Sequence, residues 1–231
     1  MNKESCPFCR ELSLVITDDK LTCKNCQKYT RSLKFKEQVY NWAEQRQMWS
    51  WRLIIWIWFS WQLFLLINKS SSTWATIFNP LDWLNFGMHE LGHFIFQPFG
   101  EFLKIAGGSI FQLLVPLLWL AGFLQKKMYF AASMCIAWLG MNFFDVAIYA
   151  ADARARMLSL SSFAGLSGEQ SDALYDRAHD WYQMLNRTNL LDYDLTIATW
   201  LRVAGTTCFV IGLGLSGLLM WHMYTGNRKH K

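Results

Sequence analysis

The chain has 231 residues and a formal net charge of +5, and 53% of its residues are hydrophobic while only 17% are charged. Soluble domains contain about 25% charged residues, so this composition excludes an ordinary soluble enzyme and favours an integral membrane protein. The positive charge gathers at the two ends and forms no long basic stripe, so nucleic acid is not an expected partner.

Residues 1–30 carry two Cys-x-x-Cys pairs, Cys6 with Cys9 and Cys23 with Cys26, on either side of a segment with the pattern of a β-hairpin. Paired Cys-x-x-Cys spacing is typical of a tetrahedral zinc site, and a module with so small a core needs such a cross-link. We therefore predict a β-hairpin zinc ribbon. The alternative is two disulfides, which the lack of an export signal before the pairs disfavours.

The rest of the chain divides by polarity. Residues 31–48 are polar and basic and are predicted to form a linker or helix, and residues 49–231 are predicted to form the membrane domain. Its apolar segments are 49–67, 81–99, 102–124, 128–151 and 201–224, with a polar loop at 152–198. A spanning helix needs about 20 residues, which most of these segments provide.

The number of spans depends on segment 81–99, which is apolar but contains several polar residues. Five spans place the basic clusters at 126–127 and 228–231 on the side opposite the ribbon, against the positive-inside tendency. If 81–99 is re-entrant, four spans remain and both clusters lie with the ribbon. Charge favours four spans and length favours five. We predict an all-α integral membrane domain of four to five apolar helices, preceded by the ribbon.

Segment 81–99 contains His89-Glu90-Leu91-Gly92-His93, which matches the H-E-x-x-H pattern. Residues four apart share a helix face, so both imidazoles can bind one zinc ion, and Glu90 can act as general base toward water. Ionisable residues inside a membrane segment are costly and usually functional. The alternative is a polar cluster that only holds helices together.

A third metal ligand is expected on the 128–151 helix, where Asn142, Asp145, Tyr149 and Asp152 recur on one face. Asp145 lies inside the apolar segment and matches the expected depth of the metal, whereas Asp152 lies at its end. His179 is another alternative if the polar loop folds back over the site, and Asp180 then orients a ligating histidine. Residues expected to line the site are Gln112, Asn142, Tyr149 and Asp180.

The motif at His89, Glu90 and His93 resembles the site-2 protease class of intramembrane metalloproteases. Asp145 follows Asn-Phe-Phe, however, and does not stand in the Leu-Asp-Gly setting of that family. The wider pattern of residues 81–195 resembles a group of small bacterial membrane proteins with an H-E-x-x-H motif. The resemblance implies a metallopeptidase-like site in a bacterial inner-membrane protein, and the charge distribution predicts that the ribbon is cytoplasmic.

The motifs and the resemblance predict a zinc-dependent intramembrane peptidase that cleaves membrane-associated polypeptides. His89, His93 and Asp145 are expected to bind the zinc ion, and Glu90 is the expected catalytic base. The alternative is a non-catalytic membrane subunit or assembly factor whose site is structural or handles metal. Expected cofactors are two zinc ions, one in the ribbon and one in the membrane domain. Expected partners are membrane lipid and either a membrane polypeptide substrate or a partner subunit.

Overall fold

The computed structural model describes residues 6–10, 14–17, 20–27, 30–44, 49–68, 79–155, 157 and 179–229. Residues 45–48 of the predicted linker and 158–178 of the predicted polar loop lie outside the described residues. The chain divides into two compact units, one of residues Met1–Arg52 and Leu218–Lys231 and the other of residues Leu53–Gly217. Each unit is described by itself.

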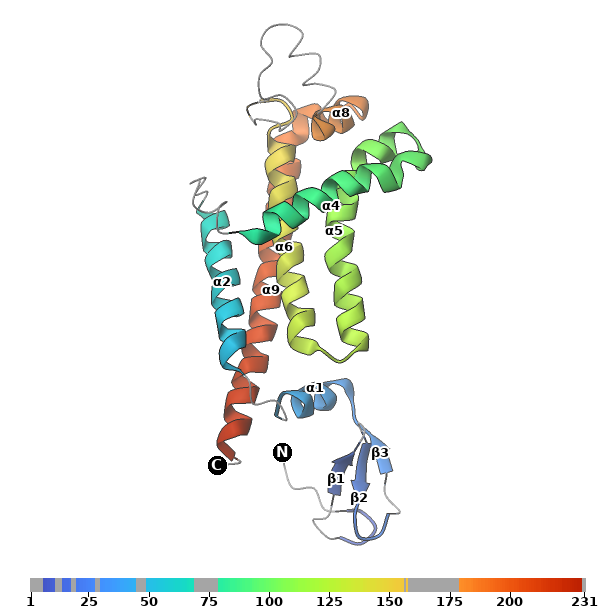
Figure 1. Cartoon of the computed structure of the whole chain (residues 1–231), viewed down its shortest axis with the longest axis vertical. Coiled ribbons are helices and arrows are strands. Elements are labelled where there is room, and N and C mark those ends of the chain that lie inside the picture. Colours follow the sequence, from blue (N-terminus) through green and yellow to red (C-terminus); the bar gives the residue numbers. More distant parts are fainter. Residues whose placement is uncertain are drawn as a thin grey trace, which may run out of the picture. The chain divides into compact units, whose positions relative to one another are not determined.

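The first unit contains the predicted ribbon hairpin. Strands β1 (Leu14–Thr17) and β2 (Lys20–Cys23) form the predicted antiparallel hairpin, in which Leu14 lies opposite Cys23. A third strand, β3 (Thr30–Ser32), pairs with β2 and completes a sheet of order β1-β2-β3 (Figure 1). The sequence analysis assigned most of β3 to the linker, because Thr-Arg-Ser has no apolar alternation to indicate a strand.

Helix α1 (Phe35–Glu44) follows this sheet, so the predicted linker or helix is helical over these residues. Arg31 of β3 donates two hydrogen bonds to the Glu37 carboxylate, at 3.0 and 3.1 Å, and so connects the sheet to the first turn of α1. The end of the last helix also belongs to this unit, since the His222 ring lies 4.3 Å from the Tyr40 ring, centroid to centroid.

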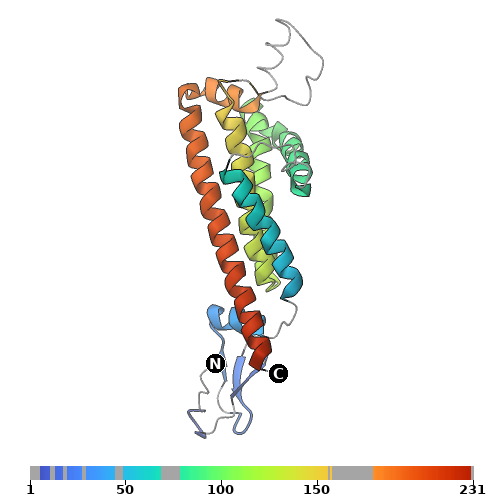
Figure 2. The ribbon, with the colours of Figure 1, turned by 90° about the vertical axis from the view of Figure 1, so that its left-hand side faces the viewer.

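The second unit is built on four helices that run side by side: α2 (Ser50–Ile67), α5 (Glu101–Gln125), α6 (Tyr129–Ala151) and α9 (Asp194–Lys229) (Figures 1 and 2). Among the described helices, these four are long and apolar enough to cross a membrane. This number agrees with the four-span alternative that the charge distribution favours. Helix α9 begins seven residues before the predicted segment, at Asp194, whose carboxylate suits the positive end of a helix.

Glycines let α6 and α9 pack closely. A Cβ atom added to Gly140 would lie 2.7 Å from the carbonyl oxygen of Gly205, and one added to Gly212 would lie 2.6 Å from the backbone nitrogen of Ala137. The two pairs run in opposite directions along the chain, so the helices are antiparallel. Trp56 of α2 donates a hydrogen bond of 2.9 Å to the carbonyl of Leu213, which joins α2 to the same bundle.

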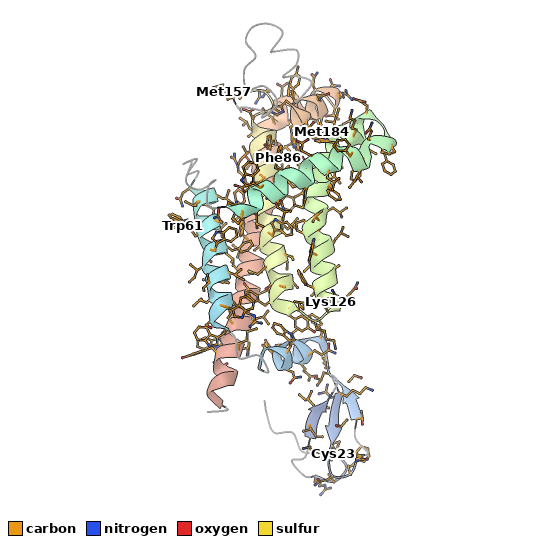
Figure 3. All side chains as sticks on the ribbon, viewed as in Figure 1. Cys23, Trp61, Phe86, Lys126, Met157 and Met184 are labelled. Atoms are coloured by element: carbon orange, nitrogen blue, oxygen red, sulfur yellow. The ribbon has the colours of Figure 1, made fainter. Side chains whose placement is uncertain are left out.

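Helix α4 (Pro80–Phe96) differs from these four helices in direction. Its side-chain cap is Asn79, which accepts a hydrogen bond from the Leu81 N–H, and Pro80 occupies its first turn. The short helix η1 (Gln97–Phe99) and Gly100, with φ of 102°, end it. Helix α4 lies across α5 and α6 near the end of the bundle that also carries α8 (Asp180–Arg187) (Figure 1). Lys126 marks the opposite end of α5 (Figure 3).

Candidate metal centres

The four ribbon cysteines converge on one point. The sulfur atoms of Cys6 and Cys26 lie 3.6 Å apart and those of Cys9 and Cys23 lie 3.5 Å apart, and all four lie within 4.8 Å of one another. Four thiolates around a tetrahedral zinc ion, with Zn–S bonds of 2.3 Å, would be about 3.8 Å apart. Each separation far exceeds a disulfide bond of about 2.05 Å, so these four cysteines form no disulfides. The cluster therefore fits a metal ion and not the disulfide alternative.

The second group of candidate ligands joins α4 to α8. The Nε2 atoms of His89 and His93 lie 3.0 and 3.1 Å from Oδ2 of Asp180, and the three ligand atoms form a compact set. Tetrahedral zinc with bonds of 2.0–2.1 Å would separate such atoms by about 3.3 Å. The three side chains are 16 to 21% exposed, so the group stays accessible. His89, His93 and Asp180 can therefore hold one metal ion.

Hydrogen bonds to the other ring nitrogens orient both histidines. Nδ1 of His93 lies 2.8 Å from the carbonyl oxygen of Lys104, and Nδ1 of His89 lies 3.2 Å from Oε1 of Gln112. A carbonyl oxygen only accepts, so Nδ1 carries the proton in each ring. In the neutral form each Nε2 atom then has its lone pair directed at the Asp180 carboxylate. Two lone pairs and a carboxylate this close need a cation among them.

The electrostatics of the group agree with this requirement. The hydrogen bond to Asp180 raises the pKa of His93 to about 9, against the opposing effect of burial. Burial favours a raised pKa for Asp180, but the hydrogen bonds from His89 and His93 outweigh it and hold this pKa below its usual range. The site therefore stabilises positive charge between the two Nε2 atoms and the carboxylate, which either protons or a metal ion can supply.

Close contact between α4 and α5 places the histidines against bare backbone. A Cβ added to Gly107 would lie 2.7 Å from the carbonyl oxygen of Gly92, so side chains at these positions would separate the helices. A Cβ added to Gly108 would lie 2.6 Å from Nε2 of His89 and 2.7 Å from Nε2 of His93. Glycine at 108 therefore leaves free the space beside the candidate ligand atoms.

Helix α8 is fixed on the bundle by contacts on both sides of Asp180. Trp181 donates a hydrogen bond of 3.1 Å to the Ser109 hydroxyl, and Met184 packs against Ile105 and Ala106 of α5. His179 is 1% exposed and caps α8, since its Nδ1 atom accepts a hydrogen bond from the Tyr182 N–H. These contacts make Asp180 the first residue of a well-anchored helix.

The structure places the two alternative third ligands of the sequence analysis together, away from the histidine pair. Nε2 of His179 lies 3.3 Å from Oδ2 of Asp152, and both side chains are buried. The pair connects the end of α6 to the start of α8. Within the described end of the predicted loop, Asp180 and not His179 lies against the two histidines.

Asp145 also lies outside the histidine pair. Its Oδ2 atom accepts hydrogen bonds of 2.8 Å from Asn85 and 3.3 Å from Gln112, and Gln112 in turn contacts Asn142 at 3.1 Å. Among the described residues, the carboxylate that groups with the two histidines is that of Asp180 and not that of Asp145. Asp145 was selected on depth alone, and depth does not separate a metal ligand from a buried partner of its neighbours.

Glu90 and Tyr149, two of the predicted site residues, lie near the candidate metal ligands but are not ligands themselves. Glu90 is exposed, and its carboxylate makes no hydrogen bond or ion pair within the described part of the chain. The Tyr149 ring is nearly parallel to the His89 ring, at 21° and 6.2 Å between centroids, and is 39% exposed. Both side chains remain available to a molecule that approaches the site.

No family model matches the chain, and comparisons with curated proteins and with solved structures found no similar protein.

Proposed function

We propose that the protein is a zinc-dependent peptidase of the membrane, with His89, His93 and Asp180 as zinc ligands and Glu90 as general base. The observation that carries the proposal is the convergence of two Nε2 atoms and one carboxylate oxygen within 3.0–3.1 Å, beside an unpaired glutamate. Three protein ligands leave one position of a tetrahedral zinc ion open, which is the arrangement of catalytic zinc sites.

Zinc suits both sets of ligands. Thiolates favour zinc among the common biological cations, and two imidazoles with one carboxylate are a known set of catalytic zinc ligands. When bound at the second site, zinc supplies a Lewis acid that polarises a carbonyl group and makes water more acidic.

Within this site the protein contributes the base. Glu90 directly follows the candidate ligand His89 on α4, and no described residue forms a hydrogen bond or ion pair with its carboxylate. It can therefore accept a proton from a water molecule that attacks a peptide carbonyl and then pass that proton to the leaving amine. Asp180 is held by both histidines, so its carboxylate is not available for the same task.

The surface of α4 supports a substrate that is itself in the membrane. Large apolar side chains of α4 are exposed, most strongly Trp83 at 81% and Phe94 at 70%. An apolar surface of this kind is unusual in water and suits lipid. We infer that α4 lies within one leaflet without crossing, and that peptide segments reach Glu90 from the membrane.

The positive-inside tendency predicts on which side of the membrane the histidine site lies. Lys126 and Lys127 lie at the turn between α5 and α6, at the end away from α4 and α8 (Figure 3). Assigning this turn to the cytoplasm puts the histidine site in the opposite leaflet. The same orientation retains the expectation of a cytoplasmic ribbon in a bacterial inner membrane.

Removal and return of zinc test the proposed activity. The full chain, reconstituted in vesicles with membrane proteins of its expression host, is expected to create new polypeptide termini that mass spectrometry can count. A zinc chelator should abolish them, and added zinc should restore them. A chain that holds both zinc ions and creates no new termini would contradict the peptidase and favour the non-catalytic membrane subunit.

The ribbon gives a separate prediction. Replacing Cys6 and Cys9 by serine is expected to lower the zinc content by one ion per chain, because the single zinc ion of the ribbon needs all four thiolates. The small sheet should unfold with this loss, while the helix content of the membrane domain stays unchanged. Replacing Cys135 and Cys208, which lie on α6 and α9, is the matched control. Full zinc content in the Cys6→Ser, Cys9→Ser variant would exclude a ribbon zinc site.

A further inference from the structure

A buried row of amide groups connects the metal ligand His89 to Asp145. Gln112, which is 4% exposed, stands between them on α5. Its Oε1 atom lies 3.2 Å from Nδ1 of His89, and its Nε2 atom lies 3.3 Å from Oδ2 of Asp145. One end of the glutamine amide therefore faces the metal ligand and the other faces the carboxylate.

The neighbours of Gln112 determine on which side its amide oxygen lies and on which side its NH2 group lies. A carboxylate accepts hydrogen bonds, so the NH2 group of Gln112 faces Asp145. The same NH2 group donates to Oδ1 of Asn142 at 3.1 Å, while Nδ2 of Asn142 donates to the carbonyl oxygen of Trp138. Both neighbours are acceptors, which leaves the Gln112 oxygen to face His89.

Asp145 is itself fixed from the other side. Asn85, which is 2% exposed, donates to Oδ2 of Asp145 at 2.8 Å. The indole N–H of Trp138 donates to Oδ1 of Asn85 at 2.9 Å, so the orientation of the Asn85 amide is fixed as well. The carboxylate thus has two donors directed at one oxygen atom, and it cannot turn without breaking both contacts.

We propose that Asp145, acting through Gln112, is a positioning residue that keeps His89 in the tautomer with its proton on Nδ1. This proposal rests on the proposed metal centre and assigns Asp145 a role other than ligation. With the proton on Nδ1, the lone pair of Nε2 is free for the metal ion. A neighbour of this kind fixes the ring of a metal-ligating histidine and typically changes metal affinity 10- to 100-fold.

The two histidines differ in the group that accepts the hydrogen bond from Nδ1 and so fixes the tautomer. Nδ1 of His93 donates to the backbone carbonyl of Lys104, which no side-chain substitution removes. His89 depends on side chains alone. Changes at Gln112 or Asp145 should therefore act on one ligand and leave the other as an internal reference.

The test measures zinc affinity in the full chain by competition with a chelator. Gln112→Met removes the acceptor for His89, and Asp145→Leu removes the acceptor that orients Gln112. Each is expected to weaken zinc binding at the membrane site by about 10- to 100-fold, with binding still complete at saturating zinc. Gln62→Met is the matched control, because Gln62 is another glutamine that is 4% exposed, on α2. It should leave the affinity unchanged.

Two further measurements separate positioning from a general structural role. Nitrogen NMR of the imidazole rings should show the Nδ1–H tautomer of His89 in the parent and a mixture of tautomers in Gln112→Met, with His93 unchanged. The conservative variant Asp145→Asn keeps a side-chain oxygen that can accept from both Asn85 and Gln112, so the orientation of the Gln112 amide is retained. It should bind zinc within about threefold of the parent, because an amide oxygen accepts hydrogen bonds as a carboxylate oxygen does.

The outcomes are distinct. Parent-like affinity and an unchanged His89 tautomer in both Gln112→Met and Asp145→Leu would overturn the positioning role. If Asp145→Leu binds no zinc at the membrane site even at saturating zinc, the positioning role is overturned in favour of direct ligation by Asp145. A parent chain that binds one zinc ion, in the ribbon alone, would overturn the metal centre itself.

Discussion

Replacing Glu90 by glutamine is expected to leave both zinc ions bound and to lower peptide cleavage by about 100-fold or more, the usual effect of removing a general base. Glutamine has the size of glutamate but accepts no proton at neutral pH. The substitution touches none of the ligands, because Glu90 is exposed and no described residue bonds to its carboxylate. Zinc content and the number of new termini, measured on the same preparation, check this result.

The chain provides a matched control for Glu90→Gln. Glu101 is another exposed glutamate and stands in the first turn of α5, outside the group of metal ligands. Glu101→Gln makes the same chemical change and should retain the cleavage of the parent. If Glu90→Gln cleaves as fast as the parent with zinc bound, Glu90 is not the base and the proposed mechanism fails.

Asp180→Ala is expected to lose the zinc ion of the membrane site, so that the content falls from two ions per chain to one. The reason is that Asp180 supplies the only carboxylate oxygen near both Nε2 atoms within the described chain. The Asp180→Ala loss should exceed the 10- to 100-fold weakening expected for Asp145→Leu, since removal of a ligand costs more than removal of a residue that orients one. Zinc content at a series of fixed free zinc concentrations measures both.

Asp192→Ala is the control for this substitution. Asp192 lies in the same segment of the chain, but its side chain is 92% exposed, at the margin of the Arg154 ion pair. Its removal should leave two zinc ions bound. Retention of both ions by Asp180→Ala, together with a fall to one ion in an Asp145→Ala variant, would return the third ligand to Asp145, the residue that the depth argument favours.

Much of the fold could be predicted from local sequence signals. Pro80 marks the first turn of α4 and Gly100 its far boundary, and long uncharged segments locate the four spanning helices. The Cys-x-x-Cys pairs define the ribbon because a thiolate site imposes a fixed spacing on the chain. These features depend on residues close together in sequence, which is why the sequence alone reveals them.

The third ligand could not be predicted in the same way. Asp180 begins α8, and its distance from the histidines depends on how residues 153–179 return to the bundle. No helical periodicity connects the two regions, so depth in the membrane was the available criterion, and it favoured Asp145 over Asp152 and His179, with Asp180 expected only to orient a ligating histidine. The clearest signal available was the neighbouring Trp181, an amphipathic residue that packs on α5 and brings the aspartate with it.

The separation of the ligands along the chain sets an order in which the protein can be assembled. Asp180 follows His93 by 87 residues (180 minus 93). A ribosome adds about 5–20 residues per second, so a nascent chain carries both histidines for roughly 4–17 s before the third ligand exists. The ribbon cysteines are complete by Cys26 and can take up zinc first. The proposed catalytic centre is completed only after α6 and the start of α8 have been made, so a nascent chain that ends before Asp180 lacks a complete zinc site.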